Sequence, residues 1–122
     1  MSKLGEVIAK EEGYGIPGTL PTRNNNPGDL RHSPNSFHSP NDPNAIGQIK
    51  TPQLGWDDLE RQLKIDAGRG MSIQELIYSY CPPGVDNNDP AGYLDFVCEN
   101  VPCSPDDAVA EVLTIPGEYV NE

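Results

Sequence analysis

The chain has 122 residues, enough for one domain with a self-sustaining core, so we expect a single domain over residues 1–122. Nineteen Asp and Glu against eight Lys and Arg give a formal net charge of −11. This charge argues against nucleic acid as a partner, because contacts to backbone phosphates dominate such binding, and against adhesion to anionic membranes. It also opposes an anionic cell-wall substrate, unless the protein works in acid or meets the polymer through a local cleft.

The opening residues 1–6 contain no apolar h-region, and no apolar run approaches the roughly 18–20 residues needed to span a bilayer. We therefore expect no signal peptide and no membrane span, with synthesis in the cytoplasm.

The cysteines and histidines predict neither a metal nor another cofactor. Cys81, Cys98 and Cys103 cannot all pair within one chain, and without a secretory signal buried thiols are favoured, with a bridge involving Cys98 left open. No second ligand pair follows these cysteines, and His32 and His38 lie in a loop rich in Ser, Pro and Asn.

A first helix is expected over residues 2–12, with Ser2 as its cap and Gly13 as its stop. One stripe of this helix carries its apolar residues, Leu4, Val7 and Ile8. Glu11 and Glu12 follow the last two of these by one turn, so both carboxylates border the apolar face. A carboxyl packed partly against apolar neighbours at a helix end suits a general acid.

Residues 15–44 are dominated by Gly, Pro, Asn and Ser, which favours an ordered loop or short strands over a helix. Residues 45–49 form a short strand candidate. A loop of this length inside a compact domain usually has a function.

Four further helices are expected in the second half of the chain, followed by an extended tail over residues 114–122. Their start signals are Thr51-Pro52, Ser72, Asp89-Pro90 and Ser104-Pro105. The predicted fold class is therefore mainly α (α+β), with about five helices and a small loop and β insertion after the first helix.

This order of elements resembles the lysozyme-like fold, in which an early helix delivers the acid and a small β-region forms one wall of a sugar-binding cleft. The match is to small phage-type peptidoglycan hydrolases and lytic-transglycosylase-like proteins of that superfamily. It is carried by residues 8–14, 23–30, Thr51-Pro52 with Gly55-Trp56, 80–83 and Tyr93-Leu94. The Arg-Asn-Asn-Asn-Pro-Gly box over residues 23–28 is the most specific piece.

The resemblance implies an enzyme that cleaves the β-1,4 bond between N-acetylmuramic acid and N-acetylglucosamine, as a muramidase or a lytic transglycosylase. It makes Glu12 the general acid, because these proteins place the acid immediately before a glycine at the helix end. Glu11 is the alternative, since a Glu-Ser-Gly-Phe pattern aligns the acid with Glu11 when Gly13-Tyr14 is the fixed point.

The resemblance also implies that residues 15–50 form one cleft wall. The expected substrate-binding residues are Arg23, Asn24, Asn25, Asn26, Gln48 and Tyr80. For any one Asn, capping of the turn is favoured over a glycan contact, and Arg23 can equally pair with a carboxylate. Asp29 stands where the resembling box usually carries Asn, and we assign it no catalytic role. Tyr93 and the single tryptophan, Trp56, are expected in the core.

The expected partner is the glycan strand of peptidoglycan, and we expect the protein to be a monomer. It would reach the wall after lysis, in a virion or by non-classical export, as an endolysin-type phage protein does. A non-catalytic glycan-binding or virion structural module with the same fold is the alternative. A third hypothesis is an acidic interaction protein whose surface charge is its function.

Overall fold

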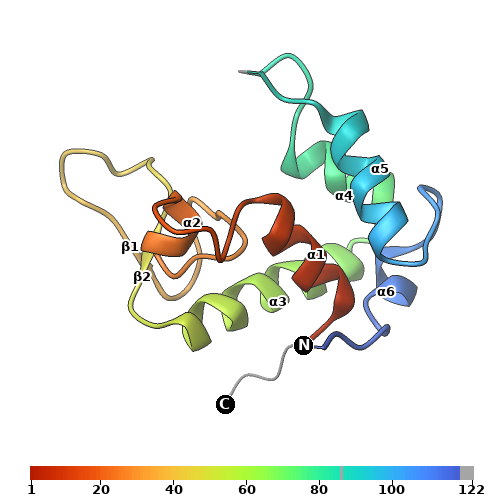
Figure 1. The fold of residues 1–122 in the computed structure, drawn as a ribbon, viewed down its shortest axis with the longest axis horizontal. Coiled ribbons are helices and arrows are strands. Elements are labelled where there is room, and N and C mark those ends of the chain that lie inside the picture. Colours follow the sequence, from red (N-terminus) through yellow and green to blue (C-terminus); the bar gives the residue numbers. More distant parts are fainter. Residues whose placement is uncertain (86, 119–122) are drawn as a thin grey trace.

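The computed structural model describes residues 1–85 and 87–118, which fold into six helices and a two-stranded sheet (Figure 1). In chain order these are α1 (Lys3–Glu11), α2 (Leu20–Arg23), β1 (Ser36–Phe37), β2 (Gln48–Ile49), α3 (Pro52–Gly68), α4 (Ile73–Tyr80), α5 (Pro90–Asn100) and α6 (Val109–Val112). The mainly helical α+β class predicted from the sequence is confirmed.

Helix α1 begins and ends where its sequence predicts. The Ser2 side chain accepts a hydrogen bond from Gly5 N at 2.9 Å, which satisfies one of the free N–H groups of the first turn. Glu12 is the C-cap residue, and its own N–H still donates to Ile8 O. Glu12 therefore leaves the helix at the boundary between the core and the segment that follows.

The segment between α1 and α3 contains one element that the prediction missed. Residues 20–23 form the short helix α2, where only a loop or strands were expected, because Pro21 is favoured in the first turn of a helix. β2 is also shorter than the predicted strand over residues 45–49, and it pairs antiparallel with β1. Figure 1 shows this whole segment on one side of α1 and α3, away from α4 to α6.

The helices that follow begin at the predicted caps, with one exception. The Thr51, Ser72 and Asp89 side chains each accept a hydrogen bond from a backbone N–H in the first turn of their helix. The fifth predicted helix does not begin at Ser104-Pro105. Residues 104–107 form a turn instead, in which Ser104 N donates to Asp107 Oδ2 at 2.8 Å, and α6 begins only at Val109.

The core lies between α1, α3, α4, α5 and α6 and is built from their aliphatic side chains. Trp56 is 4% exposed and belongs to this core, as predicted. Its ring meets Tyr14 edge-on, with 5.4 Å between the ring centroids. This contact attaches the residues just after α1 to α3.

The stretch after α6 returns to the start of the chain. Lys3 N donates to Ile115 O and Gly117 N donates to Met1 O, and residues 2 and 116 form an isolated β-bridge. Of the predicted tail over residues 114–122, residues 119–122 lie outside the described part of the chain. Among the described residues, no helix combines the length and the apolar character needed to cross a bilayer.

Candidate active site

The asparagine box after α2 is bound to both of its neighbours, β2 and α3. Ile49 N donates to Asn24 O at 2.8 Å, and Asn25 Nδ2 donates to Ile49 O at 3.0 Å. On the other side, a Cβ atom at Gly55 of α3 would lie only 1.9 Å from Asn25 O. The box and α3 therefore pack with their backbones in contact, which only glycine at position 55 allows.

Asn26 holds the turn in shape. Its side chain is fully buried and makes three hydrogen bonds, from Nδ2 to Leu30 O (2.8 Å) and Gly47 O (2.9 Å) and to Oδ1 from Leu30 N (3.0 Å). This side chain has no exposed surface to offer a glycan. Of the two roles considered for the asparagines, the structure gives Asn26 the structural one.

Tyr80, at the end of α4, fixes the next part of the same turn. Its hydroxyl donates to Gly28 O at 2.6 Å, and a Cβ atom at Gly28 would lie 2.8 Å from that hydroxyl oxygen. The pKa of the Tyr80 hydroxyl is raised well above its usual range, first by burial and then by the negative charges of Glu12, Asp29 and Asp66. Tyr80 therefore lies at the site, but its proton is committed to the backbone.

The Glu12 carboxyl lies between this turn and α5. Tyr93 of α5 donates its hydroxyl to Glu12 Oε2 at 2.7 Å, and the rings of Tyr93 and Tyr80 are neighbours, with centroids 6.4 Å apart. Tyr93 is 6% exposed and belongs to the core, as predicted. Its hydroxyl, however, has a function that the sequence did not reveal, because it holds the candidate acid.

Asp29 is the second carboxyl of the site. It follows Gly28 with a φ of +51°, a left-handed conformation that Asp and Asn adopt more readily than most residues. Its side chain lies within hydrogen-bonding reach of Glu12, and its Oδ1 atom is buried without a donor from any other described group. The pair joins residues that are distant in sequence and come from different elements.

Burial of the Glu12 side chain raises its pKa from the ordinary 4.5 to about 7. The negative charges of Asp29 and Glu11 act in the same direction, and the hydrogen bond from Tyr93 opposes them. About half of the molecules therefore still carry the Glu12 proton near neutral pH, and most do in weak acid, which is the state that a general acid needs.

Glu11 has a different environment. It is exposed, and its pKa is raised by partial burial and by the negative charge of Asp89. Of the two candidates for the acid, only Glu12 has its carboxyl enclosed by Tyr93 and Asp29. The geometry therefore favours Glu12.

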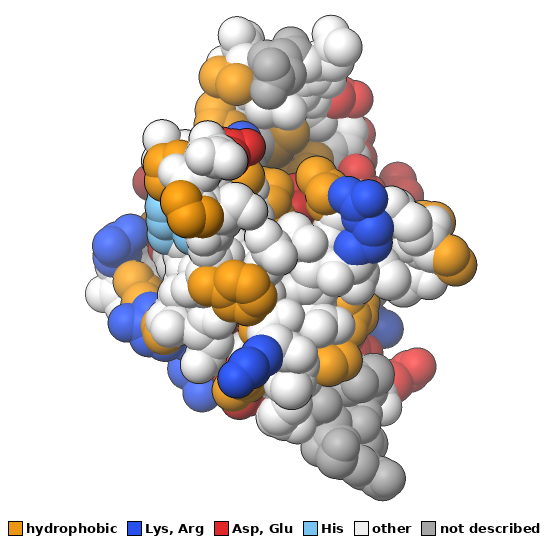
Figure 2. Space-filling model, turned by 90° about the vertical axis from the view of Figure 1, so that its left-hand side faces the viewer, with side chains coloured by type: hydrophobic (Ala, Val, Ile, Leu, Met, Phe, Trp, Pro, Cys, Tyr) orange, Lys and Arg blue, Asp and Glu red, His pale blue; other side chains and the backbone are white. Residues whose placement is uncertain are grey.

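The other expected substrate-binding residues lie on the segment between α1 and α3. Arg23 is exposed at the end of α2, Asn24 is half-buried as its C-cap, and Gln48 is half-buried on β2. This segment does not share the acidity of the rest of the chain. Residues 13–52 hold three basic and two acidic residues, so the net negative charge of the protein resides in the helical part. Figure 2 shows Lys and Arg side chains spread over this face, with most of the visible Asp and Glu towards its edges.

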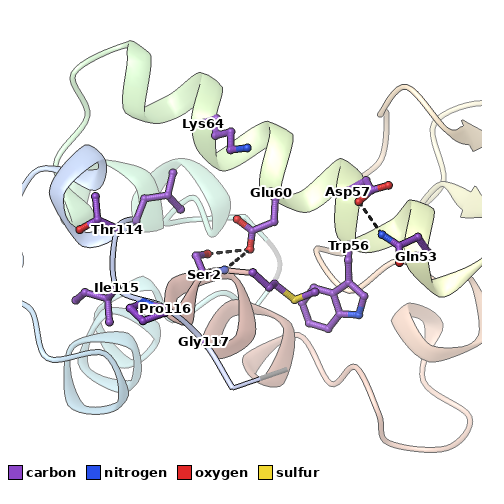
Figure 3. Close-up of a pocket in the computed structure, with 12 residues that line it drawn as sticks. Ser2, Gln53, Trp56, Asp57, Glu60, Lys64, Thr114, Ile115, Pro116 and Gly117 are labelled. Atoms are coloured by element: carbon purple, nitrogen blue, oxygen red, sulfur yellow. Dashed lines mark hydrogen bonds between the residues drawn. The ribbon is translucent and has the colours of Figure 1, made fainter. Parts of the chain in front are cut away.

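A pocket of about 760 Å³ lies elsewhere, between the start of α1, α3 and the stretch after α6 (Figure 3). Four of its polar residues are bound in pairs: Glu60 Oε1 accepts from Ser2 N at 2.9 Å and from Ser2 Oγ at 2.8 Å, and Gln53 donates to Asp57. Neither Glu12 nor Asp29 lines it. These bonds hold the N-terminus against α3, and we do not assign the pocket a catalytic role.

Within the described residues, no three His, Cys, Asp or Glu side chains come together as a metal-binding group. The site residues that sequence reasoning missed are Asp29 and the hydroxyl of Tyr93. The one available signal was the Asp at a box position where the resembling sequences carry Asn. No family model, curated protein or solved structure matches this chain.

Proposed function

We propose that this protein is a peptidoglycan-cleaving glycosidase of the lysozyme-like type, with Glu12 as its general acid. Glu12 protonates the oxygen of the β-1,4 bond between N-acetylmuramic acid and N-acetylglucosamine. The observation that carries the proposal is the enclosed Glu12 carboxyl, with Tyr93 at 2.7 Å, Asp29 in contact and a pKa of about 7. General acids of glycosidases need this combination of shelter and retained proton.

The segment over residues 15–50 supplies the proposed glycan wall, with Arg23, Asn24 and Gln48 as its contacts. The distribution of charge supports this wall, because an anionic polymer can approach a segment whose basic residues outnumber its acidic ones. The overall charge of −11 then opposes binding at the helical part rather than at the segment over residues 15–50.

Asp29 does not suit the role of a second catalytic carboxylate. Glycosidases that use two carboxyls hold them about 5–5.5 Å apart for a covalent intermediate or about 6.5–9.5 Å apart for a water. The Asp29 carboxyl instead lies in hydrogen-bonding contact with Glu12. This supports a mechanism in which Glu12 acts first as acid and then as base while a group of the substrate itself attacks, giving an anhydro sugar end as lytic transglycosylases do.

Turbidity clearing of purified peptidoglycan tests the proposal, over a range from about pH 4 to about pH 8. We expect Glu12→Gln to lose about 100-fold or more of the clearing rate, since general acid catalysis contributes at least that much. Glu11→Gln is the matched control and should retain most activity. Equal clearing by wild type and Glu12→Gln would remove Glu12 as the acid.

Mass analysis of the released sugars distinguishes the products, because an anhydro end is lighter than a hydrolysed end by one water. Absence of clearing with retained pull-down on peptidoglycan would replace the enzyme with the alternative, a glycan-binding or virion structural module. Absence of both would favour an acidic interaction protein.

A further inference from the structure

Two carboxyl groups from different parts of the chain meet at the candidate site. Glu12 ends α1, Asp29 lies in the turn after α2, and their side chains are close enough to share a hydrogen bond. Ionised carboxylates only accept hydrogen bonds and repel each other, so this contact is favourable only when one of the two carries a proton. The contact is therefore favourable only when the pair holds at least one proton, and the buried Asp29 Oδ1 atom has no other donor among the described residues.

The surroundings determine which carboxyl holds that proton. Burial raises the pKa of Asp29, but the positive charge of Arg31 and the hydrogen bond with Glu12 oppose this rise and favour its ionised form. Glu12 is enclosed more deeply and faces the negative charges of Asp29 and Glu11, both of which favour its neutral form. Glu12 is therefore the carboxyl that carries the proton, and Asp29 accepts a hydrogen bond from it.

The backbone on both sides of Asp29 is fixed, so its carboxylate can move away from Glu12 only by rotation about the side-chain bonds. Asp29 N donates to Asn26 O at 3.0 Å. The residue before it is held by the Tyr80 hydroxyl on Gly28 O, and the residue after it by Leu30 N on Asn26 Oδ1. The turn thus presents the acceptor at a set place.

We propose that Asp29 is a positioning residue that accepts a hydrogen bond from the neutral Glu12 carboxyl, keeping the acid loaded and oriented until a glycosidic oxygen takes its proton. This inference rests on the proposed function for its catalytic consequence. Tyr93 holds the other side of the same carboxyl through Oε2.

The remaining charged and titratable groups around the pair are few, and each is on a different element. Glu11 of α1 acts directly on Glu12. Asp89, the N-cap of α5, acts on Glu11. Cys81 follows α4, and burial together with the charges of Glu12 and Glu11 raises its pKa, although a backbone hydrogen bond from Asp89 opposes the rise. Of these three groups, only Glu11 changes the pKa of Glu12. Glu11 is the same in the wild type and in all the variants of the titration, so its effect is constant.

The test is a carboxyl-detected NMR titration of Glu12 in the wild type and in two variants with opposite expected shifts. Asp29→Asn is isosteric, removes the negative charge and can donate to an ionised Glu12, so the Glu12 pKa should fall by about one unit or more. Tyr93→Phe removes a donor that favours the ionised form, so the pKa should rise. Asp42→Asn makes the same change of charge on an exposed loop and should leave the pKa of Glu12 unchanged.

The pH profile of peptidoglycan clearing gives the second readout. If Asp29 positions the acid, the alkaline limb of the profile moves to lower pH in Asp29→Asn and to higher pH in Tyr93→Phe. If Asp29→Asn does not fold, Asp29→Gly keeps the left-handed backbone and carries the same expectation.

The outcomes separate the two proposals. An unchanged Glu12 titration in Asp29→Asn overturns the pairing, whether or not the wild type clears peptidoglycan. A lowered Glu12 pKa together with a moved alkaline limb supports the pairing and its catalytic consequence. A lowered pKa in a protein that never clears peptidoglycan supports the carboxyl pair and overturns the proposed function.

Discussion

Tyr93 donates its hydroxyl to Glu12 Oε2 at 2.7 Å across a separation of 81 residues in the chain. This bond joins the end of α1 to the first turn of α5, and its surroundings are buried on the α5 side. A tyrosine in a core normally needs a partner for its hydroxyl, and here the partner is an acid. The same side chain therefore serves packing and the candidate chemistry.

The sheltered Glu12 carboxyl should make stability depend on pH in a defined window. Its pKa in the folded protein, about 7, is above its ordinary 4.5, so the folded state binds this proton more tightly than the unfolded chain does. Stability is then highest at or below about pH 4.5 as far as this group is concerned, and falls as pH rises to about 7, by up to about 3 kcal/mol.

Glu12→Gln removes this titration. The melting temperature of the variant minus that of the wild type should therefore increase as pH rises from about 4.5 to about 7. Thermal unfolding of both proteins at several pH values measures the difference. A constant difference across the window would show that the Glu12 carboxyl is as well solvated in the folded protein as in the unfolded chain.

Two glycines of α3 should respond oppositely to the same substitution. Gly55→Ala forces a methyl group against Asn25 O, 1.9 Å away, so we expect a loss of about 3 kcal/mol or failure to fold. Gly68→Ala meets nothing within 4 Å and should stabilise the helix by roughly 0.5–1 kcal/mol. Urea unfolding of the two variants measures both effects. Equal tolerance at the two positions would refute the close packing of the asparagine box on α3.

Asn26 and Asn24 should separate stability from substrate binding. Asn26→Ala leaves buried backbone groups without their partners, and we expect a loss of about 3 kcal/mol in the free energy of unfolding. Asn24→Ala should change stability little, since its described bonds are made by its backbone, and should weaken peptidoglycan pull-down. Weakened pull-down by Asn26→Ala at full stability would instead assign Asn26 to the glycan.

Cys98 and Cys103 should form an intrachain disulfide under an oxidant, because their sulfur atoms lie 3.9 Å apart. Two thiols exchanging with oxidised glutathione give one bridge and two molecules of reduced glutathione. The reaction should be slow at neutral pH, since burial raises the pKa of Cys98 and raises that of Cys103 to about 12.

Intact mass after oxidation and removal of free glutathione should be lower by two hydrogen atoms in the wild type and in Cys81→Ser. Cys98→Ser should show no such loss. A bridge that includes Cys81 would contradict the described arrangement of the three thiols.

Local signals predicted most of the helical part of this fold. Ser2, Thr51 and Ser72 cap their helices through bonds that depend only on residues three positions away, so the sequence suffices to place them. At Ser104 the same kind of signal gave a turn, because the Asp107 carboxylate binds Ser104 N and the helix starts later. A cap residue predicts a local hydrogen bond, but not that a helix follows.

The candidate site was predictable only in part. Glu12 could be named as a candidate, with Glu11 as the alternative, because a helix end, an apolar stripe and a following glycine are all local features. Its partners were not, since the contacts with Tyr93 and Asp29 depend on how α5 and the asparagine turn pack against α1. The helical spacing of Tyr93 predicts a core residue, but the adjacent residues in the sequence do not indicate which group its hydroxyl contacts.

Residues 115–118 return to the start of α1 and bind it, so they help to hold the helix that carries the proposed acid. Glu118 N donates to both carboxylate oxygens of Glu6, at 2.8 and 2.7 Å, on the helix that ends at Glu12. Trimming the chain back to Thr114 would remove these anchors together with those on Met1 and Lys3. Such a truncation would loosen α1 and so disturb the position of Glu12, although residues 115–118 lie away from the proposed glycan contacts (Figure 1).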